Sequence, residues 1–248
     1  MMYLVLPAYN EEKDLGQLLG RVCAAMDDAK INYQVLLVND GSVDNTLALA
    51  QQMANSIPMQ LIDHGFNRGL GQALLSGLRR AHFLADDSDV VVTMDADNTH
   101  DPALIRAMIE QINAGYDLVI ASRYAKGGKE VGLSWERSLF SGAASFLLRL
   151  FFPIHGVKDY TCGYRAYRGE LLRRAFAAYG DGLVQERGFT CMAEVLIKMG
   201  RLSARMTEVP LVLRYDFKSG PSKMKVAHTI WRYGVLIARN LFAPLPRR

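Results

Sequence analysis

Residues 90–97 read VVVTMDAD, a largely apolar run that ends in two aspartates one residue apart. The run at 90–94 predicts a strand buried on both faces, because parallel strands covered by helices read as continuous apolar stretches. Ligands of open α/β sheets bind outside the carboxyl ends of such strands. We therefore expect Asp95 and Asp97 to lie at the ligand-binding edge of an α/β sheet.

The order of strand, polar loop and helix recurs on both sides of this stretch. The expected strands are 3–7, 34–38, 59–63, 90–94 and 117–121, and the expected helices are 12–28, 44–53 (capped by Asp44 or Asn45), 71–84 and 102–112. This alternation predicts an α/β fold with a mostly parallel central sheet flanked by helices.

The second part of the chain is less regular. It predicts helices at 134–152, 183–199 and 228–242 and a strand at 204–214. Two stretches, 145–153 and 231–242, mix bulky apolar residues with arginine. Both could lie in the interface of a membrane with anionic lipid, or pack as core helices whose arginines reach the solvent.

Composition bounds the kind of protein. The chain has 248 residues, of which 50% are hydrophobic and 22% charged, so it suits one domain, or two small ones, with a packed core, and disorder is excluded. Residues 1–100 carry 6 basic and 13 acidic side chains, a net charge of −7, and residues 101–248 carry 23 and 12, a net charge of +11. This division suggests two tasks on one scaffold.

The cysteines, and the lack of a signal peptide or an apolar stretch of spanning length, indicate the cellular compartment. Cys23, Cys162 and Cys191 show no CxxC spacing, which disfavours a disulfide framework or a zinc site and favours a reducing compartment. We see no signal peptide and no apolar stretch of spanning length. We therefore expect a cytoplasmic protein, soluble or peripheral at a membrane surface.

Three polar clusters follow predicted strands. Asp95 and Asp97 can share a divalent cation whose shell a nucleotide diphosphate completes, or they can cap the helix after Pro102. Asp40, before Gly41, can accept hydrogen bonds from a base or ribose, or belong to a capped loop. The third cluster, 67–73, has glycines beside a helix start that permit a close approach to a ligand, although Leu74 stands where a dinucleotide fingerprint has glycine.

Taken together, the blocks resemble the inverting family 2 glycosyltransferases of GT-A fold, in particular the branch of dolichyl-phosphate mannose synthases and polyprenyl-phosphate sugar transferases. The matching blocks, in family order, are 7–12, 39–46, 67–73, 95–97, 121–124 and 159–165, with a weaker block at 220–223. The resemblance implies a Rossmann-like sheet. It also implies a GT-A domain over 1–225, with a donor half at 1–100 and an acceptor half at 101–225, followed by an amphipathic helix and tail at 226–248.

The resemblance also implies residue roles on the donor side. The nucleotide would be held by Pro7, Ala8, Tyr9, Glu11, Asp40, Asn67, Gly69, Gly71, Asp95 and Ala96. Asp95 and Asp97 would bind Mg²⁺ or Mn²⁺, and Asp97 would also serve the reaction. Thr99 stands where the mannose synthase branch has a glutamine that meets the metal, with His100 beside it.

On the acceptor side, the resemblance implies cations and a hydroxyl that receive phosphate: Arg123, Arg137, Ser141, Arg165 and Lys223. Arg137 and Ser141 lie four residues apart, on one face of a helix. The family's basic loop usually carries an arginine at the position of Phe217. Each of these cations could instead be solvated surface.

The implied function is metal-dependent transfer of a sugar from GDP-mannose or a UDP-sugar to a polyprenyl or dolichyl phosphate. An anionic acceptor needs cations rather than a strong base. The alternative is a hydroxyl acceptor on a glycan, small molecule or protein, for which Asp159, Glu186 and Glu194 are candidate bases. A non-catalytic sugar-nucleotide binding or scaffold protein is a third reading. A membrane surface or a separate membrane-anchoring subunit is an expected partner, and nucleic acid is not.

Overall fold

The computed structural model describes residues 1–132, 135–217 and 226–242 and shows a seven-stranded sheet in the order β3-β2-β1-β4-β7-β5-β8. Its strands are β1 (Met2–Ala8), β2 (Tyr33–Asn39), β3 (Met59–Asp63), β4 (Val90–Thr93), β5 (Leu118–Ser122), β7 (Arg165–Arg168) and β8 (Met206–Pro210). Every neighbouring pair is parallel except those made by β7, which runs antiparallel to both β4 and β5. The expected mostly parallel α/β sheet is confirmed.

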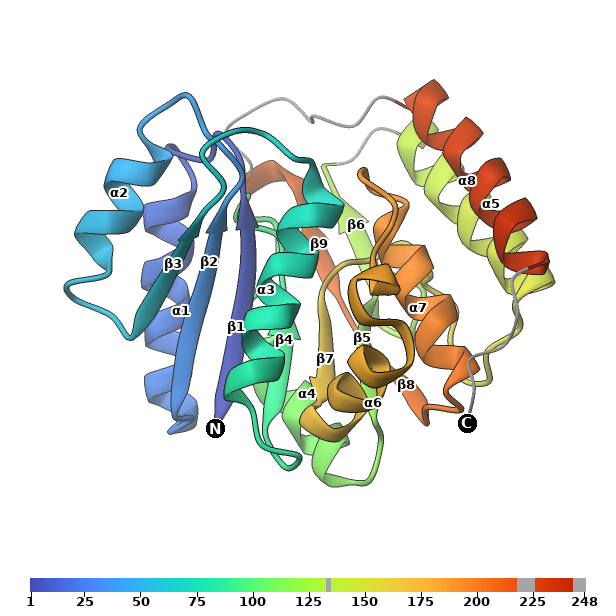
Figure 1. Cartoon of the computed structure of the whole chain (residues 1–248), viewed down its shortest axis with the longest axis horizontal. Coiled ribbons are helices and arrows are strands. Elements are labelled where there is room, and N and C mark those ends of the chain that lie inside the picture. Colours follow the sequence, from blue (N-terminus) through green and yellow to red (C-terminus); the bar gives the residue numbers. More distant parts are fainter. Residues whose placement is uncertain (133–134, 218–225, 243–248) are drawn as a thin grey trace.

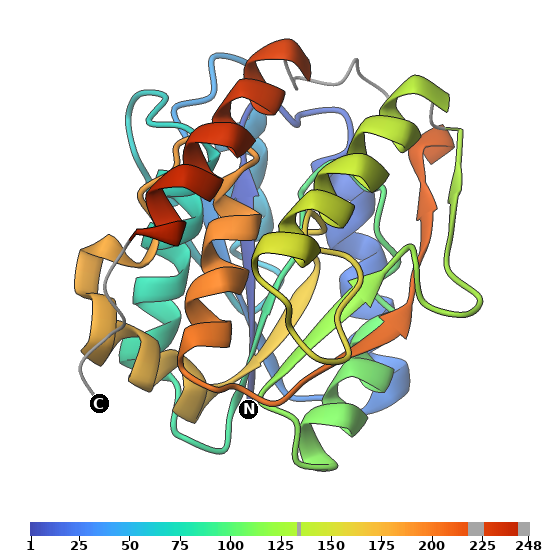
Figure 2. The ribbon, with the colours of Figure 1, turned by 90° about the vertical axis from the view of Figure 1, so that its right-hand side faces the viewer.

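Helices cover both faces of the sheet (Figures 1 and 2). One face carries α3 (Leu70–Leu84), α6 (Gly169–Tyr179) and α7 (Cys191–Arg201), and the other carries α1 (Leu15–Ala29) and α4 (Leu104–Asn113). The short helix α2 (Thr46–Met53) packs on α1 and β3. Because β1 is buried at every position, it reads in the sequence as a continuous apolar run.

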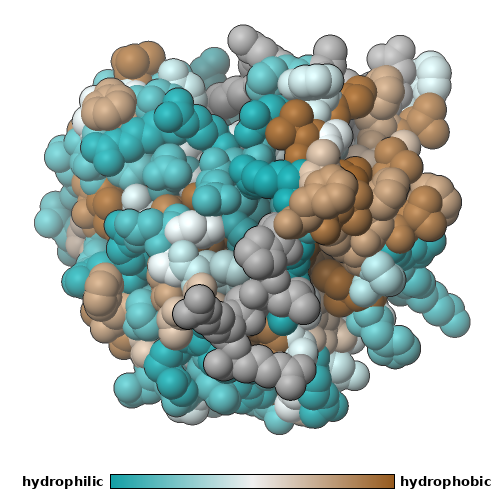
Figure 3. Space-filling model, turned by 45° about the vertical axis from the view of Figure 1, so that its right-hand side comes forward, coloured by the Kyte–Doolittle hydropathy of each residue, from teal (hydrophilic) through white to brown (hydrophobic). Residues whose placement is uncertain are grey.

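Two long helices pair on one side of the molecule. These are α5 (Trp135–Phe151) and α8 (Val226–Leu241), which lie side by side (Figures 1 and 2). The outer surface of the pair is apolar (Figure 3). In the described part of the chain, no helix is both long and apolar enough to cross a bilayer.

Two expected elements were wrong in their extent. The helix predicted at 183–199 is a 3₁₀ turn (Gly180–Leu183), a loop at 184–190 and then α7. The loop forms because the carboxylate of Glu194 accepts the backbone N–H groups of Gln185 and Glu186, each at 2.8 Å, so a tertiary contact replaces helical bonding.

The strand predicted at 204–214 is divided between two sheets. It ends as β8 at Pro210 and resumes as β9 (Val212–Arg214), which pairs with β6 (Lys129–Val131). Pro210 has no N–H to donate, and Leu211 instead donates to the carbonyl of Ser122 at 2.9 Å. This break turns the chain across the carboxyl end of β5.

Candidate active site

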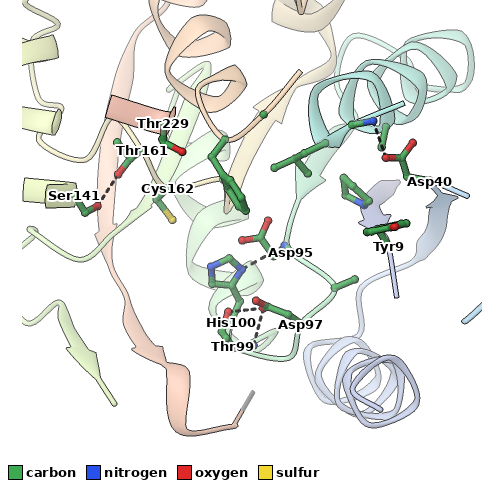
Figure 4. A pocket seen from close by; sticks show the side chains of 18 of the residues that line it. Tyr9, Asp40, Asp95, Asp97, Thr99, His100, Ser141, Thr161, Cys162 and Thr229 are labelled. Atoms are coloured by element: carbon green, nitrogen blue, oxygen red, sulfur yellow. Dashed lines mark hydrogen bonds between the residues drawn. The ribbon is translucent and has the colours of Figure 1, made fainter. Parts of the chain in front are cut away.

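A cavity of about 400 Å³ lies at the carboxyl ends of β1, β2, β4 and β5. The loop at 184–190 and the inner faces of α5 and α8 form its other walls. Figure 4 shows an ordered row of groups: Tyr9 and Asp40 at one end, Asp95 and Asp97 in the middle, and Ser141 with Thr161 at the far end.

Most of the residues singled out from the sequence line this cavity. Those in its lining are Pro7, Ala8, Tyr9, Glu11, Asp40, Asn67, Gly69, Asp95, Ala96, Asp97, Thr99, Arg123 and Ser141. Gly71 and Arg165 are not part of the lining. The side chain of Arg137 and the whole of Lys223 lie outside the described residues.

The Asp40 end is built from two crossover loops. Asp40 follows β2 and accepts the backbone N–H groups of Arg68 and Gly69, both at 2.9 Å. Gly41 has a φ of +67°, and a Cβ there would overlap the backbone of Phe66. Glycine at 41 therefore lets the two loops close on each other around the Asp40 carboxylate.

Gly71 has a different role from the one expected. Its N–H donates to the carbonyl of Arg187 at 3.0 Å, and a Cβ at 71 would overlap the carbonyl oxygen of Glu186. The glycine thus admits the 184–190 loop against the start of α3 rather than a ligand. The expected direct contact of Gly71 with the nucleotide is not supported, because protein backbone occupies that space.

The two aspartates in the middle of the cavity follow β4. Asp97 accepts the Thr99 hydroxyl at 2.7 Å, and His100 stacks on Tyr164 with ring centroids 5.0 Å apart while its Nδ1 accepts the Asp95 N–H at 3.4 Å. No group of three or more His, Cys, Asp or Glu side chains in the described ranges could hold a metal. Two carboxylates alone suit a hard cation whose remaining ligands come from a phosphate.

Arg123 is held by acids rather than left as a free cation. It forms a two-pronged pair with Asp159 (2.8 and 2.7 Å) and also donates to Glu130 (3.0 Å) and Thr161 (2.6 Å). Of its five N–H groups, one on Nη1 is left for a ligand as far as the described contacts extend. Thr161 in turn lies 3.1 Å from the Ser141 hydroxyl.

Burial and ion pairing shift the pKa values of Arg123 and Asp159 in opposite directions. Burial alone would lower the pKa of Arg123, but the Asp159 carboxylate outweighs it and holds that pKa well above its usual value. Burial would likewise raise the pKa of Asp159, but Arg123 keeps it below its usual range. Both groups therefore stay charged at neutral pH, and Asp159 is a poor proton acceptor.

Arg165 does not reach the cavity. It is fully buried, and its guanidinium donates to the backbone carbonyls of Met192 (2.6 Å) and Tyr160 (3.0 Å). The expected contact between Arg165 and a phosphate is thus not supported, since the side chain joins β7 to α7 and to the 160–163 loop instead.

The other two candidate bases are occupied by ion pairs that anchor α8. Glu186 accepts Arg232 at 2.8 Å, and Glu194 accepts Arg239 and Lys198 at 2.6 and 2.7 Å. Both glutamates are fully buried. The ion pairs therefore hold a wall of the cavity in place and leave neither carboxylate open to a substrate.

Sequence reasoning missed several cavity residues. Arg187 and Phe189 come from the 184–190 loop, and Thr229, Ile230 and Tyr233 come from α8. The loop was read as the start of a helix, so its residues had no place in a site. The spacing of α8 showed an amphipathic helix but not which of its faces lines the cavity.

Comparisons with known proteins place the chain among sugar transferases. Residues 3–176 match the model of glycosyl transferase family 2. The chain is 34% identical over 232 residues to a dolichol-phosphate mannosyltransferase of Pyrococcus furiosus. The matched region covers 93% of this chain and 60% of that protein. It is 33% identical over 227 residues to a polyprenol monophosphomannose synthase of Mycolicibacterium smegmatis (89% and 80%). It is also 34% identical over 221 residues to an undecaprenyl-phosphate mannosyltransferase of Micrococcus luteus (89% and 86%).

Solved structures agree on the fold. Glucosyl-3-phosphoglycerate synthase of Mycobacterium tuberculosis, in complex with Mn²⁺, UDP and glucosyl-3-phosphoglycerate, superposes with a TM-score of 0.67 at 19% identity, covering 97% of this chain and 78% of that one. Mannosyl-3-phosphoglycerate synthase of Rubrobacter xylanophilus gives 0.62 at 22% identity, with 97% and 72% coverage. The expected GT-A architecture is confirmed.

Proposed function

Because the chain belongs to the family 2 glycosyltransferases, we propose that it transfers a sugar from a nucleoside-diphosphate sugar to a polyprenyl phosphate. The observation that carries the proposal is the order of groups along the cavity: a base-accepting end, a carboxylate pair and a hydroxyl and arginine end (Figure 4). Mannose is the first sugar to test, since the three relatives bear mannosyltransferase or mannose synthase names.

The donor would lie along the part of the cavity built by residues 1–100. Tyr9 and Asp40 would hold the nucleoside, with Glu11 and Asn67 at the same end, and the base would be guanine or uracil. This division between a donor half and an acceptor half at 101–225 is supported by the cavity lining, which takes Asp95 from the first and Ser141 from the second.

Asp95 and Asp97 would hold Mg²⁺ or Mn²⁺ on the diphosphate, with Thr99 keeping Asp97 in place and adding a weak ligand. The hard oxygen donors of this pair fit such a cation, and Mn²⁺ occurs in the complex of a protein with the same fold. When bound, the metal stabilises the charge of the leaving nucleotide.

The acceptor phosphate would lie against the hydroxyls of Ser141 and Thr161 and the remaining N–H of Arg123, with Arg137 and Lys223 as further cations. A phosphate monoester is ionised at neutral pH and can attack the anomeric carbon in line without a general base. A hydroxyl acceptor fits less well, because Asp159, Glu186 and Glu194 are buried and paired.

The lipid tail of such an acceptor needs an apolar surface, and the outer side of α5 and α8, whose inner residues line the cavity, supplies one (Figure 3). Trp135, Leu150 and Trp231 are 73%, 64% and 69% exposed. We propose that this surface lies in the membrane interface, where apolar burial and the basic second part of the chain act together.

The test is a donor panel with a short polyprenyl phosphate. GDP-mannose, UDP-glucose and other UDP-sugars are each supplied with Mg²⁺ or Mn²⁺, and we expect one of them to give product in the organic phase. Arg123→Ala and Arg137→Ala should reduce that transfer strongly. If both variants transferred at the wild-type rate, the proposed acceptor site would be wrong.

A further inference from the structure

The nucleoside end of the cavity is backed by a chain of three polar side chains, of which Asp40 and His64 are buried and Ser76 is half-buried. His64 Nδ1 lies 2.8 Å from Asp40 Oδ1, and His64 Nε2 lies 2.9 Å from the Ser76 hydroxyl. The His64 and Asp40 side chains are each only 4% exposed. Asp40 lines the cavity, but His64 and Ser76 do not, so any effect of these two on a ligand passes through Asp40.

The positions of the protons follow from the partners. An ionised carboxylate only accepts hydrogen bonds, so Nδ1 of His64 carries a hydrogen and donates it to Asp40. In the neutral ring Nε2 then accepts, and the Ser76 hydroxyl donates to it. Asp40 therefore fixes the tautomer of His64, and Ser76 holds the ring in place through the other nitrogen.

Counting acceptor positions on Asp40 shows what remains for a ligand. Oδ1 accepts His64 and the Arg68 N–H, and Oδ2 accepts the Gly69 N–H. A carboxylate has about four acceptor positions. One position, on Oδ2, is therefore left for a donor group that enters the cavity.

We propose that His64, locked by Ser76, is a positioning residue that makes Asp40 a reader of the nucleobase. A single acceptor position takes a ring N–H, which uracil has at N3 and guanine at N1. The matching ring nitrogens of cytosine and adenine are acceptors that a carboxylate repels. The chain Asp40–His64–Ser76 thus favours uridine or guanosine diphosphate over the cytidine and adenosine forms.

The order serine, histidine, aspartate is also that of hydrolase triads, which place the serine against the substrate. Here Ser76 lies within α3 and away from the cavity lining. The end of the chain that lines the cavity is Asp40, so the arrangement suits recognition rather than nucleophilic attack.

The experiment measures binding of UDP, GDP, CDP and ADP, and of pyrophosphate as a base-free ligand, all with Mn²⁺. It uses the full chain and the variants His64→Ala, His64→Asn and Ser76→Ala. We expect His64→Ala to weaken the preferred nucleotide about tenfold, the size of one hydrogen bond to a charged group, and to leave pyrophosphate unchanged. His64→Asn should restore most of the affinity, because its amide nitrogen stands near the place of Nδ1, and Ser76→Ala should show a smaller loss.

Two controls separate positioning from stability. His82→Ala changes a histidine of α3 that stacks on Phe176 outside the cavity and should bind nucleotide as the wild type does. In an Asp40→Asn background, His64→Ala should have no further effect on affinity, because its action passes through Asp40.

The proposal is overturned if His64→Ala binds like the wild type, if it weakens pyrophosphate equally, or if its loss persists in full in the Asp40→Asn background. The inference rests on the proposed function only in requiring that the cavity binds a nucleoside diphosphate. A wild-type chain that binds UDP or GDP but transfers no sugar to polyprenyl phosphate would overturn the function and leave this inference standing.

Discussion

At the residue scale, the Arg123–Asp159 pair lies at the proposed acceptor end of the cavity, and it should also contribute to stability. Asp159→Asn leaves a buried arginine without its main partner, so we expect the free energy of unfolding at pH 7 to fall by about 3 kcal/mol. Urea unfolding measures the change. Asp87→Asn, which breaks the exposed pair with Arg173, is the matched control and should change little.

The same pair should make the stability of the folded chain depend on pH in the acid range. Arg123 holds the pKa of Asp159 in the folded chain below its value in the unfolded chain. The stabilisation is therefore complete above about pH 4, the ordinary aspartate pKa, and is lost as the pH falls through the lower folded value. Between pH 6 and pH 2, the free energy of unfolding should fall less in Asp159→Asn than in the wild type. Identical acid profiles would contradict this account of the pair.

Thr99 is a residue where this chain differs from the pattern that the family resemblance implied. Its hydroxyl donates to Asp97, so Thr99→Val should let the carboxylate turn and raise the Mn²⁺ concentration for half-maximal transfer about tenfold. Thr99→Gln, which offers an amide oxygen, should bind Mn²⁺ at least as well as the wild type. The readouts are the metal dependence of transfer and Mn²⁺ binding in the presence of nucleotide. A Thr99→Val protein with wild-type Mn²⁺ affinity would argue against the support of Asp97.

At the scale of elements, α8 is a wall of the site that two buried glutamates hold in place. Removing Arg232 and Arg239 together leaves Glu186 and Glu194 short of partners, so we expect α8 to separate from the core and transfer to be lost. Hydrogen exchange should rise in 226–241 and little in β1, which is fully buried in the sheet. Unchanged protection of α8 would contradict the anchoring role.

The outer surface of α5 and α8 makes a separate prediction about lipid. Replacing Trp135 and Trp231 by serine removes two exposed indoles, and partition onto anionic liposomes should fall at least tenfold, since each large apolar side chain contributes about 1.5–3 kcal/mol when fully buried. Flotation measures it. Phe83→Ser is the control, because Phe83 is 72% exposed but belongs to α3. Equal flotation of all three proteins would exclude this surface as the membrane contact.

The elements also show how far a sequence can be read. The strands β1 and β4 were predictable, because strands inside the sheet are buried along their whole length and read as apolar runs. β7 was not, since its four residues, Arg165–Arg168, include two arginines and carry no period. The 184–190 loop was hidden because Glu194, several residues away, takes the backbone N–H groups that a helix would use internally.

The site residues also divide into those that the sequence could predict and those that only the fold reveals. Asp40, Asp95 and Asp97 were found because strand ends converge at one edge of a parallel sheet. Arg165 was assigned to a phosphate because a motif records the residue type and not its burial. His64 stood in no motif, and only the fold shows that it touches Asp40.

At the scale of the whole molecule, the uneven charge now has a partial cause. The acidic residues Asp40, Asp95 and Asp97 of the first part all line the cavity, on the side proposed for the donor. The cations of the second part do not all face it, since Arg165 is buried and Arg232 and Arg239 bind the glutamates that anchor α8. Part of the net charge of +11 in 101–248 therefore holds the fold together, and part remains for the contacts with phosphate and anionic lipid that we propose.

The central claim is that the acceptor is a phosphate on a lipid. The most direct measurement compares a short polyprenyl phosphate with the matching polyprenol, using a radiolabelled donor and Mn²⁺, and counts label in the organic phase. We predict label with the polyprenyl phosphate and none with the polyprenol, because the phosphate needs no base and the candidate carboxylates are paired. Equal label with the free alcohol, or label that appears only on a water-soluble acceptor, would contradict the account.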